Sequence, residues 1–130
     1  MLSRLIIRNY AIIPELDIAI QPGLTIITGE TGAGKSILLG ALGLALGRRA
    51  ETKVLPDDDS KCIVEAHFQL EEESLKSLFA AEGLDYDSLL ICRREISSGG
   101  RSRSFINDTP VSLKLLQEIT GHLIELHHQH

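Results

Sequence analysis

The chain has 130 residues, of which 43% are hydrophobic, and its 13 basic and 18 acidic residues give a formal net charge of −5. This length can bury one core, so we expect residues 1–130 to form one soluble domain or one lobe of a larger domain, and a multidomain machine is excluded. A net negative charge provides no global positive field for nucleic acid. No apolar run reaches the roughly 18 residues that span a bilayer, so neither membrane insertion nor secretion is expected.

The first half of the chain predicts strands that lead into a glycine-rich loop and then a helix. Two apolar segments with β-branched or alternating residues indicate strands joined by a turn near Pro14. A third, buried strand runs directly into the loop. A helix rich in Leu and Ala follows, with Gly47 as its stop. The expected elements are the strands Leu2–Arg8, Leu16–Ile20 and Leu24–Thr28 and the helix Lys35–Leu46.

The second half predicts a surface loop followed by alternating strands and helices. The loop, Arg48–Lys61, contains three consecutive aspartates, Asp57–Asp59. We interpret them as a solvated turn rather than a cation site, because no ligand spacing such as an EF-hand pattern accompanies them. Alternation places His67 on the solvent side of a half-buried strand. The expected elements are strands Val64–Phe68, Leu89–Ile96 and Ser104–Asn107, helices Glu71–Ala81 and Thr109–Gly121, and a final apolar run, Leu123–Leu126.

The two cysteines, Cys62 and Cys92, each lie in an apolar run. In that setting a buried free thiol is favoured over a disulfide. This pattern predicts a protein of the reducing cytoplasm.

The loop between the third strand and the helix has the pattern G-x-x-x-x-G-K-S. Its glycines allow the backbone to curl so that N–H groups point at phosphate oxygens. Lys35 would reach the β- and γ-phosphates, Ser36 would bind Mg²⁺, and the helix would present its positive N-terminal end to the same anion. The predicted ligands are ATP and Mg²⁺, and the predicted binding residues are Gly29, Glu30, Thr31, Gly32, Ala33, Gly34, Lys35, Ser36 and Ile37.

Hydrolysis needs more than this loop. A P-loop ATPase also requires a Walker B carboxylate at the end of an apolar strand and a group that orients water. The apolar runs after the loop end in Leu70–Glu72, Cys92–Arg94 and Leu126–His127, and none continues into Asp-Glu. The sequence therefore predicts half of a catalytic site, with Lys35 as its catalytic lysine.

Segments along essentially the whole chain carry a family resemblance. They are Leu5–Tyr10, Pro22–Leu39, Ala45–Ala50, Arg94–Ile96, Gly100–Asn107 and the terminal His-x-Gln-His. These segments resemble the N-terminal head segment of the RecN family of bacterial DNA-repair proteins, which are SMC-like ABC-type ATPases. The Glu-Thr-Gly-Ala-Gly filling of the loop is more typical of this family than of its SMC relatives.

The resemblance implies an α/β fold, namely the N-terminal lobe of a P-loop NTPase head of the ABC/SMC type, with a mixed β-sheet packed around the P-loop helix. It also implies a C-terminal lobe beyond a long coiled-coil hairpin, which would carry Walker B, the signature motif and the catalytic glutamate. Such heads bind ATP, pair face to face around two nucleotides, and couple hydrolysis to DNA engagement in recombinational repair of double-strand breaks. The implied location is the bacterial cytoplasm, at the nucleoid.

The resemblance also assigns a second catalytic and metal-binding residue. Gln129 matches the family's glutamine after the final strand, which resembles the Q-loop residue that contacts Mg²⁺ and the attacking water. A frayed terminal glutamine is the alternative. Two other functions stay open for the chain: a small P-loop phosphotransferase, and a non-catalytic nucleotide-dependent interaction module that pairs with a lobe from another chain.

The arginines outside the loop each have two possible roles. Four arginines around the Ser-Ser-Gly-Gly turn would form a basic patch for DNA phosphates or a partner head, or simply a soluble hairpin tip. Arg48 and Arg49 would approach phosphates or cap the preceding helix, and we favour the cap. Histidines near the end of the sequence match no recognised zinc spacing. The arginines are Arg93, Arg94, Arg101 and Arg103, and the histidines are His122, His127, His128 and His130.

Overall fold

The computed structural model describes residues 1–20, 32–50, 60–70 and 75–128, except for the side chains at 33, 35 and 124–128. A six-stranded sheet forms one layer, in the order β2-β1-β3-β4-β5-β6, and all five pairings between these strands are antiparallel. The strands are β1 (Leu2–Tyr10), β2 (Ile13–Ala19), β3 (Cys62–Gln69), β4 (Leu89–Ile96), β5 (Ser102–Ile106) and β6 (Thr109–Val111).

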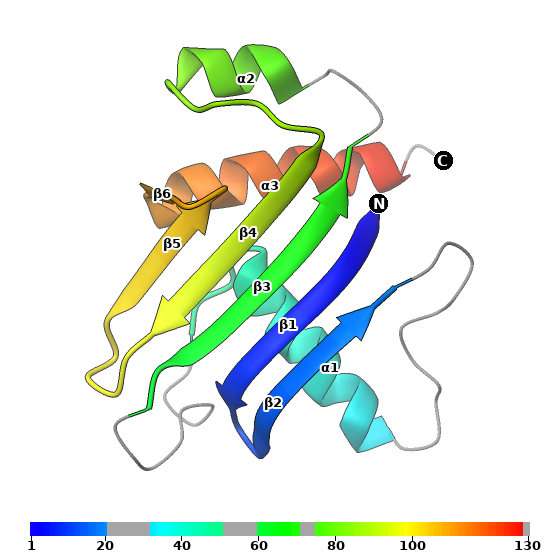
Figure 1. Cartoon of the computed structure of the whole chain (residues 1–130), viewed down its shortest axis with the longest axis vertical. Coiled ribbons are helices and arrows are strands. Elements are labelled where there is room, and N and C mark those ends of the chain that lie inside the picture. Colours follow the sequence, from blue (N-terminus) through cyan, green and yellow to red (C-terminus); the bar gives the residue numbers. More distant parts are fainter. Residues whose placement is uncertain (21–31, 51–59, 71–74, 129–130) are drawn as a thin grey trace.

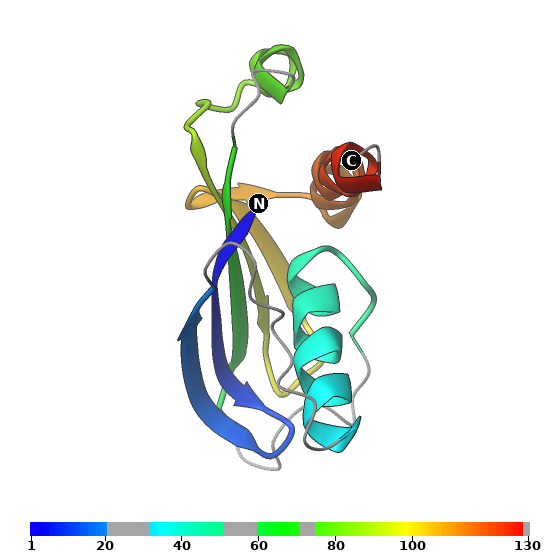
Figure 2. The same ribbon diagram turned by 90° about the vertical axis from the view of Figure 1, so that its right-hand side faces the viewer.

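Two helices form the second layer. The helices α1 (Gly32–Ala45) and α3 (Leu113–His128) lie on the same face of the sheet, while the short α2 (Lys76–Ala81) lies beyond the ends of β3 and β4 (Figures 1 and 2). Within the described part of the chain, the opposite face of the sheet carries no helix (Figure 2). None of the described helices is long and apolar enough to cross a membrane.

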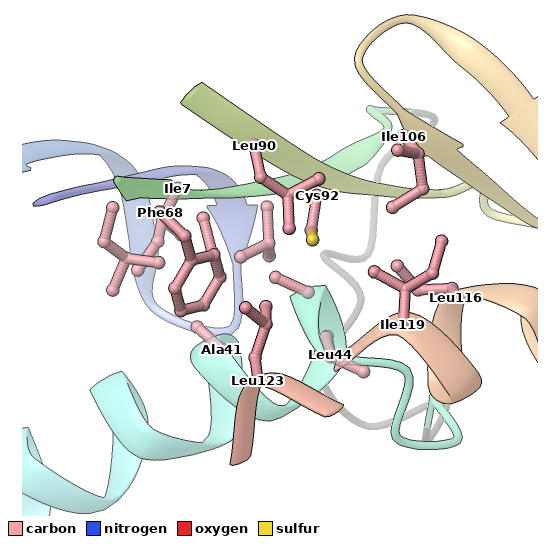
Figure 3. Packing of buried hydrophobic residues seen from close by; sticks show 14 of the residues in the cluster. Ile7, Ala41, Leu44, Phe68, Leu90, Cys92, Ile106, Leu116, Ile119 and Leu123 are labelled. Atoms are coloured by element: carbon pink, nitrogen blue, oxygen red, sulfur yellow. The ribbon is translucent and has the colours of Figure 1, made fainter. Parts of the chain in front are cut away.

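Alternating burial along the strands builds the core. In β3, Cys62, Val64, Ala66 and Phe68 are buried toward the helices, as a period of two requires. The core between the sheet, α1 and α3 is apolar and continuous (Figure 3). It includes Ile7, Leu90 and Cys92 from the strands, Ala41 and Leu44 from α1, and Leu116, Ile119 and Leu123 from α3.

The structure confirms most of the expected elements. The strand Leu89–Ile96 has its predicted bounds. Its expected hairpin partner near Ser104 is present as β5, and the two strands expected at the start of the chain are present as β1 and β2. The helix after the glycine-rich loop starts earlier than expected, at Gly32. Its stop is confirmed, because Gly47 has a φ of +108°. The helix expected from Glu71 is described only as α2, and the strand Leu24–Thr28 and Asp57–Asp59 lie outside the described residues.

Three local predictions were wrong. The first turn is formed by Ala11 and Ile12, and Pro14 lies within β2. His67 lies on the uncovered face of the sheet, but it is not open to solvent there, because its side chain is only 13% exposed and its Nε2 lies 3.5 Å from Oε1 of Glu65. The helix expected at Thr109 starts at Leu113 instead, and it continues through Gly121 and the apolar run Leu123–Leu126 to His128.

The missed element is a tight hairpin. Asn107 and Asp108 have φ values of 47° and 68° and join Ile106 to Thr109 in a two-residue turn, so Thr109–Val111 becomes strand β6. Two consecutive positive φ angles define a type I′ turn, whose twist suits a hairpin. Ser112 then caps α3 by accepting a hydrogen bond from the Leu115 amide at 3.0 Å.

Candidate nucleotide-binding site

The second half of the glycine-rich loop forms the beginning of α1. The helix starts at Gly32, so Gly34 and Ser36 belong to its first turn and a half, and both are exposed. The first amides of a helix have no intrahelical acceptors, and the helix dipole adds positive potential there. This end of α1 therefore has the local structure that binds anions, and Ser36 is open to solvent as a Mg²⁺ ligand would need to be.

Several predicted ligands cannot be placed on this framework. Gly29, Glu30, Thr31 and Gln129 lie outside the described residues, and so do the side chains of Ala33 and Lys35. Ile37, the last predicted residue, is partly buried and packs against the core, so it helps to seat the helix on the sheet. The structure thus describes the helix on which the predicted phosphate site would be built, while the site itself and the contacts of Lys35 and Gln129 stay predictions.

Small residues bring α1 close to the sheet. Ala41 and Ala45 are fully buried, and α1 packs on β1, β3 and β4. At Gly40 a Cβ atom would lie 2.5 Å from the Tyr10 hydroxyl oxygen, so only glycine fits there without displacement. The helix that carries the phosphate loop therefore lies almost directly on the strands.

The C-terminal end of α1 closes in a Schellman motif. The Arg48 amide donates to the Gly43 carbonyl at 2.9 Å, and the Gly47 amide donates to the Leu44 carbonyl at 3.1 Å. These two bonds and the positive φ of Gly47 are the defining features of that motif. The Arg48 side chain lies along the same turn, because a Cβ on Gly43 would approach its guanidinium at 3.3 Å.

Side chains from two other elements also donate hydrogen bonds to carbonyls at this end. Nη1 of Arg94, on β4, donates to the carbonyl oxygens of Leu44 at 3.0 Å and Arg48 at 2.9 Å. From α3, the Thr120 hydroxyl donates to the Leu46 carbonyl at 2.7 Å, and Nε2 of Gln117 donates to the Gly47 carbonyl at 2.8 Å. We call Arg94, Gln117 and Thr120 the C-terminal clamp.

Arg94 is the central residue of this clamp and is 1% exposed. Its Nε and Nη2 both donate to the Ser102 hydroxyl, at 3.1 and 2.7 Å. Burial lowers the pKa of the guanidinium from its usual value. Within the described part of the chain no carboxylate pairs with Arg94, so its charge is balanced by carbonyl dipoles at the negative end of α1.

The predicted basic patch of four arginines does not exist as a single surface. Adjacent residues of a strand point to opposite faces, so Arg94 enters the core while Arg93 lies on the uncovered face. There Arg93 lies 4.2 Å from the Phe105 ring centroid and pairs with Glu95 at 3.2 Å and Asp108 at 2.9 Å. Arg103 also stacks near the Phe105 ring, and Arg101 is exposed.

Sequence reasoning therefore missed Arg94 as a buried cap and assigned the cap to Arg48 or Arg49. The sequence did contain a signal for the burial of Arg94. This residue lies on the same face of its strand as Leu90, Cys92 and Ile96, which are all apolar. Arg48 contributes its carbonyl as an acceptor for Arg94, and its guanidinium lies along the last turn of α1 beside Gly43, where a cation is favoured. Arg49 is exposed, and the structure gives it no role in closing the helix.

In the described ranges, no three His, Cys, Asp or Glu side chains gather as a metal site. Cys62 and Cys92 are free and fully buried, as predicted. Burial raises the pKa of Cys62 to about 11 and that of Cys92 to about 12, so neither is a thiolate ligand at neutral pH. The side chains of His127, His128 and His130 lie outside the described residues.

Residues 4–122 match the family model of the AAA domain. The chain belongs to this AAA domain family. Among its curated relatives is the DNA repair protein RecN of Haemophilus influenzae, which is 42% identical over 134 residues, and those of Vibrio cholerae and Bacillus subtilis are 44% and 39% identical. All three alignments cover 100% of this chain but only 23–24% of the relative. The expected resemblance to the N-terminal segment of RecN is thereby confirmed.

Solved structures confirm the fold class. The Smc head domain of Pyrococcus furiosus, bound to the C-terminal domain of ScpA, superposes with a TM-score of 0.73 at 17% identity, over 91% of this chain and 32% of that one. The SMC head domain of Thermotoga maritima gives 0.65 at 20% identity, over 90% and 41%. The recombination mediator RecF gives 0.66 at 17% identity, over 89% and 29%. The AAA domain described here thus has the fold of a P-loop NTPase head of the SMC type.

Proposed function

We propose that this chain is the ATP-binding N-terminal lobe of an SMC-like ATPase head that acts in recombinational repair of DNA double-strand breaks. The observation that carries the proposal is the position of the motif Gly29–Ser36, whose second half begins the helix seated on the sheet of an SMC-type head. RecN relatives at 34–44% identity supply the repair context. Because the chain spans about a quarter of their length, the activity of the whole protein is part of the proposal.

The residues of this chain would hold ATP and Mg²⁺ by their type and position. Backbone amides from Gly29 to Ser36 would surround the phosphates, and Lys35 would neutralise charge on the β- and γ-phosphates. Ser36 would bind Mg²⁺ through its hydroxyl, and Gln129 would complete the metal shell and orient water. Bound Mg²⁺ would neutralise charge that develops on the phosphates during transfer.

The same proposal includes a partner lobe that completes the site. The sequence offers no Walker B carboxylate, so hydrolysis would require residues from a C-terminal lobe. An exposed apolar residue on α1 supports such docking, since Leu39 is 45% exposed while Ala41 and Leu44 of the same helix face the sheet. A second head, paired through two nucleotides, and DNA are the further partners.

Titration calorimetry with ATP and Mg²⁺ tests the binding half of this proposal. Wild-type protein should bind ATP, and the Lys35→Ala variant should not. The control variant Lys114→Ala changes an exposed lysine of α3 and should bind ATP as the wild type does. Co-expression of this segment with the downstream lobe should then give DNA-stimulated ATP hydrolysis that the segment alone lacks. Robust turnover by the segment alone would refute the half-site, and transfer of phosphate to a nucleoside would favour a phosphotransferase.

A further inference from the structure

We propose that the C-terminal clamp, Arg94 with Gln117 and Thr120, is a positioning device that sets the phosphate-binding end of α1 from the opposite end of the helix. The inference rests on the proposed ATP site and adds residues that lie outside its motif. None of the clamp residues belongs to the glycine-rich loop. Each of the three donates at least one hydrogen bond to a carbonyl between Leu44 and Arg48.

The packing of α1 gives the clamp this importance. Apart from Leu44, the buried face of the helix consists of small residues, Gly40, Ala41 and Ala45, whose shallow ridges resist sliding along the helix axis less than a row of large side chains would. Polar contacts at a helix end are directional, so the clamp adds a constraint on the axial position of α1 to the one that Leu44 and the contact of Gly40 with Tyr10 provide. A shift there reaches the loop, because the 14 residues of α1 form one rigid element about 21 Å long.

The dipole of α1 also couples its two ends electrostatically. A phosphate at the N-terminus and a cation at the C-terminus are both stabilised by the dipole of the helix between them. Within the described residues no carboxylate pairs with the charge of Arg94. The negative end of the α1 dipole is therefore the main group that stabilises this charge. Ser102 fixes the other side of the guanidinium, which holds the helix end to the β4–β5 hairpin.

The clamp also joins α1 to α3. Thr120 and Gln117 hold the end of the helix that starts with the Walker A residues, and α3 leads in sequence directly to Gln129. The two segments predicted to contact the nucleotide are thus connected through hydrogen bonds far from it. Loss of the clamp should weaken nucleotide binding without removing any ligand of the nucleotide.

Variants of the clamp separate positioning from simple stability. Thr120→Val removes only the hydroxyl donor at nearly constant volume, and Arg94→Met removes the guanidinium, whereas Arg94→Lys retains one cationic donor. The matched controls are Thr109→Val and Arg101→Met, the same kinds of substitution at exposed positions. Each is made in the longest chain that the gene encodes, and ATP–Mg²⁺ affinity is measured at a temperature where circular dichroism shows every variant folded.

We expect the Kd for ATP–Mg²⁺ to rise about fivefold or more in Thr120→Val and further in Arg94→Met, with partial recovery in Arg94→Lys and no change in the controls. In hydrogen exchange, ATP should slow the Arg48 amide, which bonds to Gly43, in wild type but less in Thr120→Val. Unchanged affinity and unchanged exchange in folded clamp variants would overturn the inference alone. Failure of wild type to bind ATP, or normal binding by Lys35→Ala, would overturn the proposed function instead.

Discussion

The Tyr10 hydroxyl occupies the space that a side chain at Gly40 would need, since a Cβ there would lie 2.5 Å from the hydroxyl oxygen. Tyr10 is 6% exposed, so its ring cannot swing outward without opening the core. We predict that Gly40→Ala lowers the free energy of unfolding by about 1–2 kcal/mol. Overpacking costs about 1–3 kcal/mol, and alanine's higher helix propensity offsets up to about 1 kcal/mol of that cost. Urea denaturation measures the difference.

A second helical glycine provides the control for that substitution. Gly121 lies inside α3, and a Cβ there would meet no atom within 4 Å. Gly121→Ala should therefore raise the free energy of unfolding by about 0.5–1 kcal/mol, through helix propensity alone. If both substitutions changed stability in the same direction, the close approach of Tyr10 would not be the cause.

The Asn107–Asp108 turn predicts a contrast between two substitutions at one position. Asp108 has a φ of 68°, which glycine adopts freely and a β-branched residue does not. Asp108→Gly should keep stability within about 0.5 kcal/mol of wild type, because the lost pair with Arg93 involves a carboxylate that is 83% exposed. Asp108→Val should lower stability by about 1–2 kcal/mol. Equal thermal midpoints for the two variants would contradict the type I′ assignment.

The buried thiols predict both slow chemistry and a pH dependence. Cys62 and Cys92 are fully buried, so an aromatic disulfide reagent at pH 8 should modify neither thiol in the folded protein and both in denaturant. Their pKa values rise from 9.0 to about 11 and about 12 on burial. Above pH 9 the unfolded state therefore binds fewer protons than the folded state, and stability should fall as pH rises.

Each thiol contributes up to about 1.4 kcal/mol per pH unit to that fall between pH 9 and its folded pKa, and little below about pH 8. Cys92→Ala should flatten the dependence while lowering stability at neutral pH, because it leaves a small cavity. Denaturation curves at pH 8, 9 and 10 make the comparison. A slope that Cys92→Ala leaves unchanged would assign the pH effect to other groups.

Local sequence patterns predicted the elements but not the contacts between distant segments. The strand Leu89–Ile96 was predicted with its observed bounds because apolar residues alternate along it. Arg94 occupies a core position of that alternation, yet its partners, Leu44 and Arg48, are 50 and 46 residues away in sequence. No local pattern encodes that pairing. In the folded chain the carbonyls at the end of α1 lie beside β4, and they accept the hydrogen bonds that a buried guanidinium needs.

Turn chemistry explains the other main error. Thr109-Pro110 resembles a helix start, since threonine caps helices and proline suits their first turn. The preceding Asn107 and Asp108 tolerate positive φ and form a hairpin first, which turns the same dipeptide into strand β6. For the site itself, the motif predicted a helix that follows the glycine-rich loop, and α1 begins at Gly32, while anion binding by this helix end stays a prediction. The clamp at the other end of α1 could not be predicted from the motif, because its residues come together only in the folded chain.

Proline at both edges of the sheet has a consequence for assembly. In the described sheet the outermost strands are β2 and β6, and they contain Pro14 and Pro110. Each proline removes one amide donor from an edge, where unpaired N–H and C=O groups would otherwise recruit strands of other molecules. Each described edge therefore contains one residue that cannot donate to an added strand, which shortens the stretch of backbone open to edge-to-edge pairing to Glu15–Ala19 in β2.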